Sequence, residues 1–165
     1  MKRSIRGALA VLALQLFCSP AARAGVSEAV QKKFKGQILI SSEPLPDSVA
    51  DEAEQIRQLQ KAHTGVIGRG KGASVPVWRF HFIAFMARKP GATQVALDFY
   101  TDDKKKHFVA QERLVGIDPK LTLLQGEAEL SADDGLSADR SYVVKLTAEI
   151  KGKEVVLATT KVRTK

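Results

Sequence analysis

Alternation of apolar and polar side chains is clearest in the last quarter of the chain. From Tyr142 to Ile150 every second residue is apolar or aromatic, which is the period of a strand with one buried face. A second run rich in β-branched residues extends from Glu154 to Arg163. Gly152 lies between the two runs and readily takes the positive φ of a tight turn. The pattern therefore predicts an antiparallel hairpin of two long strands.

The turn of this hairpin decides which side of its second strand faces the core. A two-residue turn pairs Val155 and Leu157 with the apolar face of the first strand. A bulged three-residue turn pairs the alternate set instead: Val156, Ala158, Thr160 and Val162. The sequence leaves both registers open.

Five further segments upstream have the pattern of strands. The segment from Val75 to Ala87 is the most apolar and has large side chains on both faces, which is typical of a central strand. The other four run from Gln37 to Ser41, from Val95 to Thr101, from Phe108 to Leu114 and from Leu124 to Leu130. With the hairpin, the chain has seven predicted strands.

The segment just before the hairpin carries a resemblance to a known family. Leu136 lies six residues before Tyr142, which resembles the corner before the F strand of fibronectin type III and other immunoglobulin-like domains. Ala138 departs from that pattern, which usually has Pro at this position. The resemblance implies that the Tyr142 hydroxyl returns to the backbone of the corner and that Leu136 packs beneath it. We therefore expect a mainly β fold, a seven-stranded antiparallel immunoglobulin-like sandwich.

A second resemblance concerns the central strand. The stretch from Trp78 to Gly91, followed by Ala96 to Thr101, is similar to a family of exported bacterial β-sandwich proteins that has no known activity. The resemblance assigns no functional residue. Trp78 lies on one apolar face of this strand, and we expect its role to be structural.

One helix is predicted at about residues 47–64. Asp47 or Ser48 can cap its N-terminus, and Gly65 is suited to end it. Its apolar residues form one stripe that should pack on the sandwich, made of Val49, Ala53, Ile56 and Leu59. The stretch from Gly25 to Lys35 is either a second, short helix or a frayed terminus.

Residues 1–24 have the three parts of a cleaved signal peptide. A basic start precedes a short apolar run from Ala8 to Cys18, and Ala22-Arg23-Ala24 offers a small-x-small cleavage pattern. The apolar run is too short to cross a bilayer as a helix, so no transmembrane span is expected in the mature chain. We expect residues 25–165 to form a single domain in the bacterial periplasm or outside the cell.

Cleavage at this position would change the charge and the redox chemistry of the chain. Four basic residues would leave with the leader, so Lys and Arg fall from 26 to 22 against 18 Asp and Glu, and the net charge falls from +8 to +4. A surface this mildly basic does not indicate nucleic-acid binding. The single cysteine, Cys18, would also leave, so the mature domain must be stabilised by its core without a disulfide.

Motifs for catalysis, metals and cofactors are missing from the sequence. Gly65 to Gly72 follows the phosphate-loop pattern until Gly72, which stands where a Ser or Thr must hold magnesium. His63, His81 and His107 lack the spacings of metal ligands on a helix or strand. The sequence predicts no cofactor and no metal site, and it favours a protein that is not an enzyme.

Three functional hypotheses remain. The first is a non-enzymatic binding or structural module that contacts a protein or cell-envelope component through a sheet edge or through the loop from Gly65 to Ser74. The second is a hydrolase with a site assembled in space from His81, Asp98, Asp102 and Asp103. The third is an electrostatic binder of acidic glycans that uses basic loop residues, which are Arg69, Lys71, Arg88, Lys89, Lys104, Lys105 and Lys106.

Overall fold

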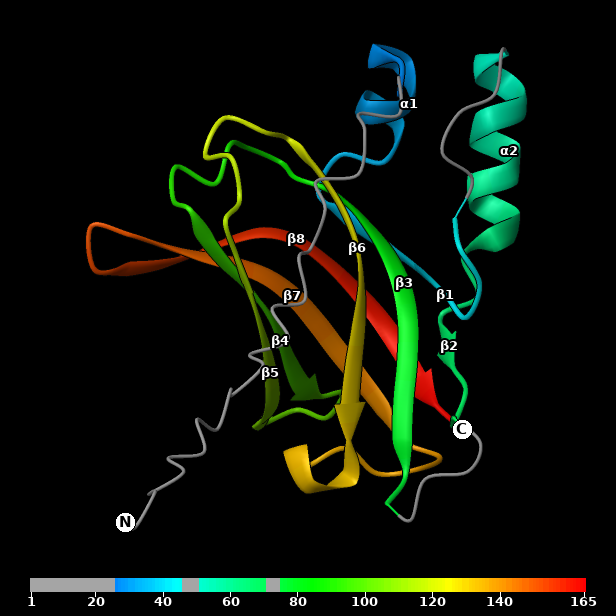
Figure 1. The fold of residues 1–165 in the computed structure, drawn as a ribbon, viewed down its shortest axis with the longest axis vertical. Coiled ribbons are helices and arrows are strands. Elements are labelled where there is room, and N and C mark those ends of the chain that lie inside the picture. The colour runs from blue at the N-terminus through cyan, green and yellow to red at the C-terminus, as the bar shows by residue number, and fades with distance from the viewer. Residues whose placement is uncertain (1–25, 46–50, 71–74) are drawn as a thin grey trace, which may run out of the picture.

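The computed structural model describes residues 26–45, 51–70 and 75–165, and these residues form a mainly β fold (Figure 1). The helices are α1 (Glu28–Lys33) and α2 (Glu52–Ala62), and a short 3-10 helix, η1, covers Ala132–Asp134. The eight strands of the described residues are β1 (Gln37–Ser41), β2 (Val66–Ile67), β3 (Val77–Phe85), β4 (Gln94–Thr101), β5 (Phe108–Val115), β6 (Leu123–Ser131), β7 (Ser141–Ile150) and β8 (Lys153–Thr164).

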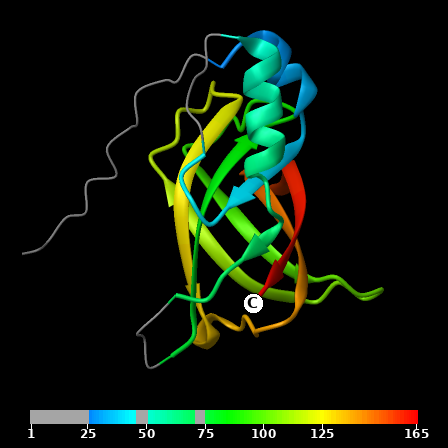
Figure 2. The same cartoon turned by 90° about the vertical axis from the view of Figure 1, so that its right-hand side faces the viewer.

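The strands form one sheet that nearly closes on itself. Their order is β5-β4-β7-β8-β1-β3-β6, and β2 pairs with β8 beside this path. The pairings of β8 with β1 and with β2 are parallel, and all the others are antiparallel. Figures 1 and 2 show the sheet curving round so that its two ends, β5 and β6, come to face the same opening. The result is a mixed, barrel-like sheet.

The seven predicted strands are all present, but the predicted seven-stranded antiparallel sandwich is not confirmed. Alternation of side chains reports which residues face inward, and it does not report whether the strands separate into two layers. The eighth strand, β2, lies within the segment predicted as a glycine-rich loop, where Ile67 is fully buried. Residues 71–74, the end of that loop, lie outside the described residues.

The main core fills the inside of the curved sheet. Trp78, Phe80 and Phe82 point inward from β3, and Leu97 and Phe99 point inward from β4. The rings of Phe80 and Phe99 meet edge to face, with centroids 6.1 Å apart. The indole of Trp78 is fully buried and donates to the carbonyl oxygen of Lys165 at 3.0 Å. This partner meets the requirement that a buried indole N–H be satisfied.

A second apolar cluster lies on the outer face of β1 and β3. Leu39, Ile83 and Phe85 point outward there and are covered by side chains of the two helices and the segment between β1 and α2, namely Val30, Phe34, Leu45 and Leu59. Figure 2 shows both helices on this side of the sheet. The predicted two-sided apolar strand is therefore confirmed in β3, which faces the main core on one side and the helices on the other.

The helix predicted at about 47–64 is shorter in the structure. It begins after Asp51, whose carboxylate accepts from the backbone N–H of Glu54 at 3.1 Å. The expected caps and the stripe residue at Asp47, Ser48 and Val49 lie outside the described residues. Gln55 and Leu59 are the buried helical positions, whereas Ala53, predicted in the apolar stripe, is exposed.

The C-terminal end of α2 is joined to β1 through a histidine. The helix ends at His63, two residues before the predicted stop. The backbone N–H of Ile40 donates to the His63 Nδ1 atom at 3.0 Å, and the Ile40 carbonyl oxygen lies 3.3 Å from the same atom. These contacts hold the end of the helix against β1.

The β7–β8 hairpin combines both registers that the sequence left open. Lys151 and Gly152 have φ values of 52° and 72°, which is the backbone of a two-residue turn, and Ala148 pairs with Val155. A bulge beyond Leu146 then shifts the pairing, so that residues from both predicted sets, Leu157, Ala158 and Val162, are buried.

The corner before β7 has the local contacts that the resemblance implied. The Tyr142 hydroxyl oxygen accepts from the backbone N–H of Ser137 at 2.8 Å, and Leu136 and Tyr142 are both buried. Gly135 has a φ of +105°, and a side chain there would meet the Val109 carbonyl oxygen at 2.8 Å. The chain at Gly135 thus passes close to the backbone of β5, and a residue with a side chain would not fit there.

Candidate functional site

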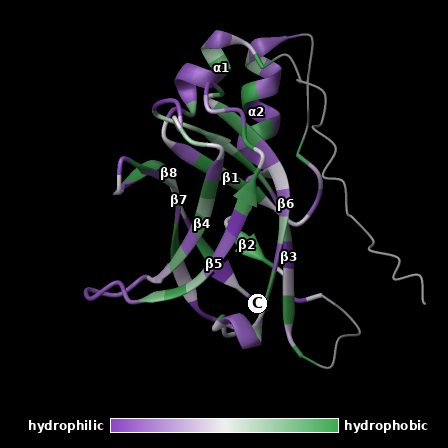
Figure 3. Cartoon of the chain, turned by 60° about the vertical axis from the view of Figure 1, so that its left-hand side comes forward, coloured by the Kyte–Doolittle hydropathy of each residue, from purple (hydrophilic) through white to green (hydrophobic). Residues whose placement is uncertain are grey.

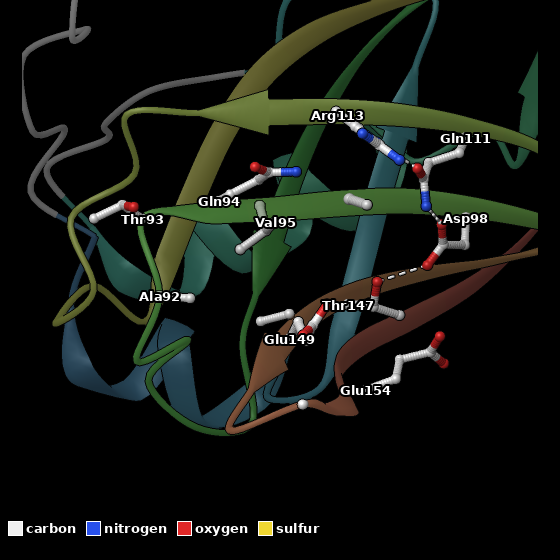
Figure 4. Close-up of a pocket in the computed structure, with 13 residues that line it drawn as sticks. Ala92, Thr93, Gln94, Val95, Asp98, Gln111, Arg113, Thr147, Glu149 and Glu154 are labelled. Atoms are coloured by element: carbon white, nitrogen blue, oxygen red, sulfur yellow. Dashed lines mark hydrogen bonds between the residues drawn. The ribbon is translucent and has the colours of Figure 1, made fainter.

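The outer face of β5, β4 and β7 lies away from the helices (Figure 1). It contains a hollow of about 630 Å³, whose lining residues are drawn in Figure 4. The alternation of β4 directs Val95, Leu97 and Phe99 into the core. It therefore directs Ala96, Asp98 and Tyr100 to the outer face. The strand register places Gln111 of β5 beside Asp98 and Thr147 of β7 beside Ala96. We call this surface the Asp98 hollow, defined by Ala96, Asp98, Gln111, Arg113, Thr147, Glu149 and Glu154.

Asp98 is buried although it lies on the outer face of the sheet. Its side chain is 2% exposed, and Thr147 beside it is 5% exposed. One carboxylate oxygen accepts from the Thr147 hydroxyl at 2.6 Å, and the other accepts from the Gln111 amide at 2.7 Å. Figure 4 shows these bonds joining three neighbouring strands. Asp98 makes no ion pair with any described residue.

A basic side chain supports this network through an amide. The Arg113 Nε atom donates to the Gln111 side-chain oxygen at 2.7 Å, which orients the Gln111 amide N–H toward Asp98. Lys145 is opposite Asp98 in the ladder, but its ammonium lies over the Tyr100 ring, 4.2 Å from the centroid. The Asp98 carboxylate is thus held by neutral donors. The two nearby cations, Arg113 and Lys145, bind Gln111 and the Tyr100 ring instead of Asp98.

Two further carboxylates belong to the same hollow. Glu149 and Glu154 are directly opposite each other near the β7–β8 turn, and both are exposed. Neither makes an ion pair within the described part of the chain. Like charges opposite each other in a ladder repel, so this pair lowers the stability of the hairpin.

Tyr100 and Phe108 form an aromatic pair beside the hollow. Their rings meet edge to face with centroids 5.8 Å apart, and Phe108 is 57% exposed. Burial raises the pKa of the Tyr100 phenol, and the charges of Glu154 and Asp98 raise the pKa further. The phenol therefore keeps its proton and can donate a hydrogen bond at neutral pH.

The arrangement can bind a ligand through many hydrogen bonds. The hollow offers carboxylate acceptors, amide and hydroxyl groups and a guanidinium donor within one open concavity. The Tyr100 and Phe108 rings add an aromatic surface outside its lining, further along the same strands. Among the residues that the structure describes, no three His, Cys, Asp or Glu side chains gather as metal ligands.

The predicted basic residues do not form one surface. Arg88 and Lys89 follow β3, whereas Lys104, Lys105 and Lys106 lie in the turn after β4. Strand β4 has 8 residues, so these two turns are separated by about 25 Å along it. Arg69 is exposed and forms an isolated bridge with Trp78, and Lys71 lies outside the described residues.

The four residues of the hydrolase hypothesis are also separated. His81 lies on β3 opposite Ser41 and Glu127, whereas Asp98 lies on β4, and three strands separate β3 from β4 within the sheet order. Asp102 binds Lys161 at 2.9 Å, and Asp103 accepts from the backbone N–H groups of its own turn. These two aspartates line a second hollow, of about 560 Å³, beside the Tyr142 corner.

Sequence reasoning missed most of the Asp98 hollow. The sequence predicts a role for Asp98 only in the hydrolase hypothesis, and it gives no signal for its partners Gln111, Thr147 and Arg113. Asp98 lies at an outward position of a strand, where an acidic residue is normally solvated. Its burial depends on Gln111 and Thr147, which are 13 and 49 residues away in sequence. Only the strand order brings them together.

Comparisons with known proteins do not add a functional assignment. No helix of the described residues is long and apolar enough to cross a membrane. No family model matches the chain, and neither the curated proteins nor the solved structures give a match.

Proposed function

We propose that this chain is an exported, non-enzymatic binding module whose ligand site is the Asp98 hollow. The observation that carries the proposal is the buried Asp98 carboxylate on the outer face of the sheet, held by Thr147 and Gln111 inside an open concavity. Such polar groups converging in a cavity are typical of ligand sites.

The energetics of Asp98 support a role beyond folding. Removing a carboxylate from water is costly, and neutral hydrogen bonds recover only part of that cost. An apolar side chain at the same position would satisfy the fold without this cost. Sites that lower stability in this way are expected where a protein binds a ligand.

The Glu149 and Glu154 pair supports the same interpretation. Neither carboxylate forms an ion pair with a described residue. A ligand that donates hydrogen bonds to these carboxylates would relieve part of the repulsion on binding.

Affinity capture tests the proposal. Residues 25–165 would be crosslinked in the native envelope fraction and the products identified by mass spectrometry, for the wild type and for Glu149→Lys. Glu149 is exposed and makes no ion pair among the described residues, so the substitution should alter the hollow without unfolding the chain. Glu43→Lys, which makes the same charge change at an exposed position just after β1, is the matched control.

The expected result is a product that the wild type and Glu43→Lys both retain and that Glu149→Lys loses. A product that all three proteins retain would place the ligand site elsewhere. An empty capture for the wild type would contradict the proposal that the chain is a binding module.

A further inference from the structure

The chemistry of the Asp98 hollow also narrows the class of ligand, if the proposed function is correct. Around the buried Asp98, the hollow presents exposed hydrogen-bond acceptors at Glu149 and Glu154 and a cationic donor at Arg113. The exposed Gln111 amide adds a neutral group in the same hollow. A ligand that fits needs both donors and acceptors, spread over its surface, and no large net charge.

The aromatic pair extends the site along the strand. Tyr100 is two residues beyond Asp98 on the same face of β4, about 7 Å away, and Phe108 of β5 is its partner in the ladder. Lys145 covers one face of the Tyr100 ring, whereas Phe108 is 57% exposed. Phe108 therefore offers an apolar surface next to the hydrogen-bonding groups.

The sign of the local charge distinguishes between neutral and acidic ligands. Three carboxylates line the hollow against the single guanidinium of Arg113. None of the basic turn residues lines the hollow: Arg88 and Lys89 precede β4, and Lys104 to Lys106 lie in the turn just before Phe108, at the aromatic end of the site. A polyanion would be repelled by the hollow itself.

From these contacts we infer that the Asp98 hollow takes a neutral oligosaccharide. Sugar hydroxyl groups both donate and accept, so they can meet the carboxylates, Gln111 and Arg113 together. The C–H face of a sugar ring is apolar and can lie on an exposed aromatic ring such as Phe108. The distance from Ala96 to Tyr100 is about 13 Å along β4, which favours several linked sugar units over a single one.

Binding to a set of purified hexasaccharides tests the inference. The neutral probes are cello-, malto-, manno- and N-acetylchito-hexaose, and the acidic probes are hexagalacturonate and a heparin hexasaccharide. Calorimetry would compare the wild type with Phe108→Ala and Gln111→Ala. Phe108→Trp preserves an aromatic surface, and Val115→Ala removes another exposed apolar side chain of the same strand.

We expect the wild type to bind at least one neutral probe and no acidic probe more tightly. Phe108→Ala and Gln111→Ala should each weaken this binding about tenfold, whereas Phe108→Trp and Val115→Ala should bind as the wild type does. Circular dichroism of each variant would show that the fold is retained. If Gln111→Ala does not fold, Arg113→Ala replaces it.

Three results would overturn the inference: preference for an acidic probe, binding that Phe108→Ala leaves unchanged, and no binding to any probe. If no probe binds while the envelope capture still depends on Glu149, the saccharide is excluded and the binding module stands, with a protein as its partner. If both experiments are negative, the proposed function also fails.

Discussion

Two parts of the outer face of the curved sheet differ in how their outward side chains are covered. On β1 and β3 the outward side chains are apolar, among them Leu39, Ile83 and Phe85, and two helices cover them. On β4, β5 and β7 no helix of the described residues lies over the sheet, and the outward position at the centre is an aspartate. Figure 3 shows that the turns projecting on this second side are hydrophilic.

The difference in covering suggests that the face of β1 and β3 stabilises the fold, whereas the face of β4, β5 and β7 is accessible to a ligand. The helix-covered face is a second core, so changes there should act on stability. The Asp98 face is buried only by its own side chains, so changes there can alter the surface chemistry while the sheet persists. Each prediction below tests this division.

The largest expected effect compares two phenylalanines, one on each outer face. Phe85 is 1% exposed and packs on Phe34 with ring centroids 5.2 Å apart, so Phe85→Ala should lower the free energy of unfolding by about 3–5 kcal/mol. Phe108 is mostly exposed, and Phe108→Ala should cost less than about 1 kcal/mol. Urea denaturation measures both. Equal losses would mean that the Asp98 face is also part of the core.

The second prediction concerns the bond between Thr147 and Asp98. Thr147→Val removes a hydroxyl donor from a buried carboxylate and should lower the free energy of unfolding by about 1–3 kcal/mol. The double variant Asp98→Val/Thr147→Val removes both polar groups and should be close to the wild type. Chemical denaturation of the three proteins gives the comparison. A double variant less stable than Thr147→Val would show that Asp98 holds the fold.

The third prediction returns to the helix-covered face. His63→Ala removes the side-chain acceptor for the buried N–H of Ile40 and should cost about 1 kcal/mol, because His63 is only half-buried and water can replace part of the bond. His107→Ala is the control, since that side chain is exposed in the β4–β5 turn. Thermal unfolding measures the midpoint of each variant. Equal midpoints for His63→Ala and His107→Ala would mean that the contact with β1 does not contribute to stability.

The smallest expected effect is electrostatic and concerns Tyr100. Burial, Glu154 and Asp98 raise the pKa of its phenol, so the folded state holds this proton more tightly than the unfolded state does. The associated stability is present below the unfolded pKa of about 10 and is lost as pH rises through the folded pKa. Glu154→Gln should move the pKa of Tyr100 downward.

The absorbance of tyrosinate follows this titration. A Tyr142→Phe background removes the other tyrosine, so the signal comes from Tyr100 alone. Lys153→Gln, which removes a charge next to Glu154 in sequence, is the control for a general change in charge. An unchanged midpoint in Glu154→Gln would mean that Glu154 lies too far from Tyr100 to act on it.

Local sequence patterns predict the strands, whereas long-range pairing determines how the strands are arranged in the sheet. The alternation from Tyr142 to Ile150 predicts β7, and the apolar residues on both sides of β3 predict that both of its faces are covered. The sheet order places β3 next to the end strand β6, and not at the centre. The parallel pairing of Gln37 with Thr159 joins segments far apart in sequence, and no local pattern encodes it. That pairing changes the expected sandwich into a nearly closed sheet.

The candidate site also depends on strand pairing that local sequence patterns do not encode. The basic residues were identified as a group because they stand out in the sequence, yet the turns of Arg88 and Lys104 lie at opposite ends of β4. Asp98 does not stand out, because a single acidic residue on a strand is common. Its importance arises from Gln111, Arg113 and Thr147, which approach it only after β4 pairs with β5 and β7.

The position of β8 has a consequence for the order in which this protein can be made. It is 12 residues long and follows the other described strands in sequence, and among the described strands it alone pairs with both groups, β5-β4-β7 on one side and β1-β3-β6 on the other. A growing chain can form local hairpins such as β4–β5 early, but the two groups cannot be joined through the sheet until β8 has been synthesised. Joining of the two halves of this sheet is therefore a late step, which comes after each half has had time to form its own local pairs.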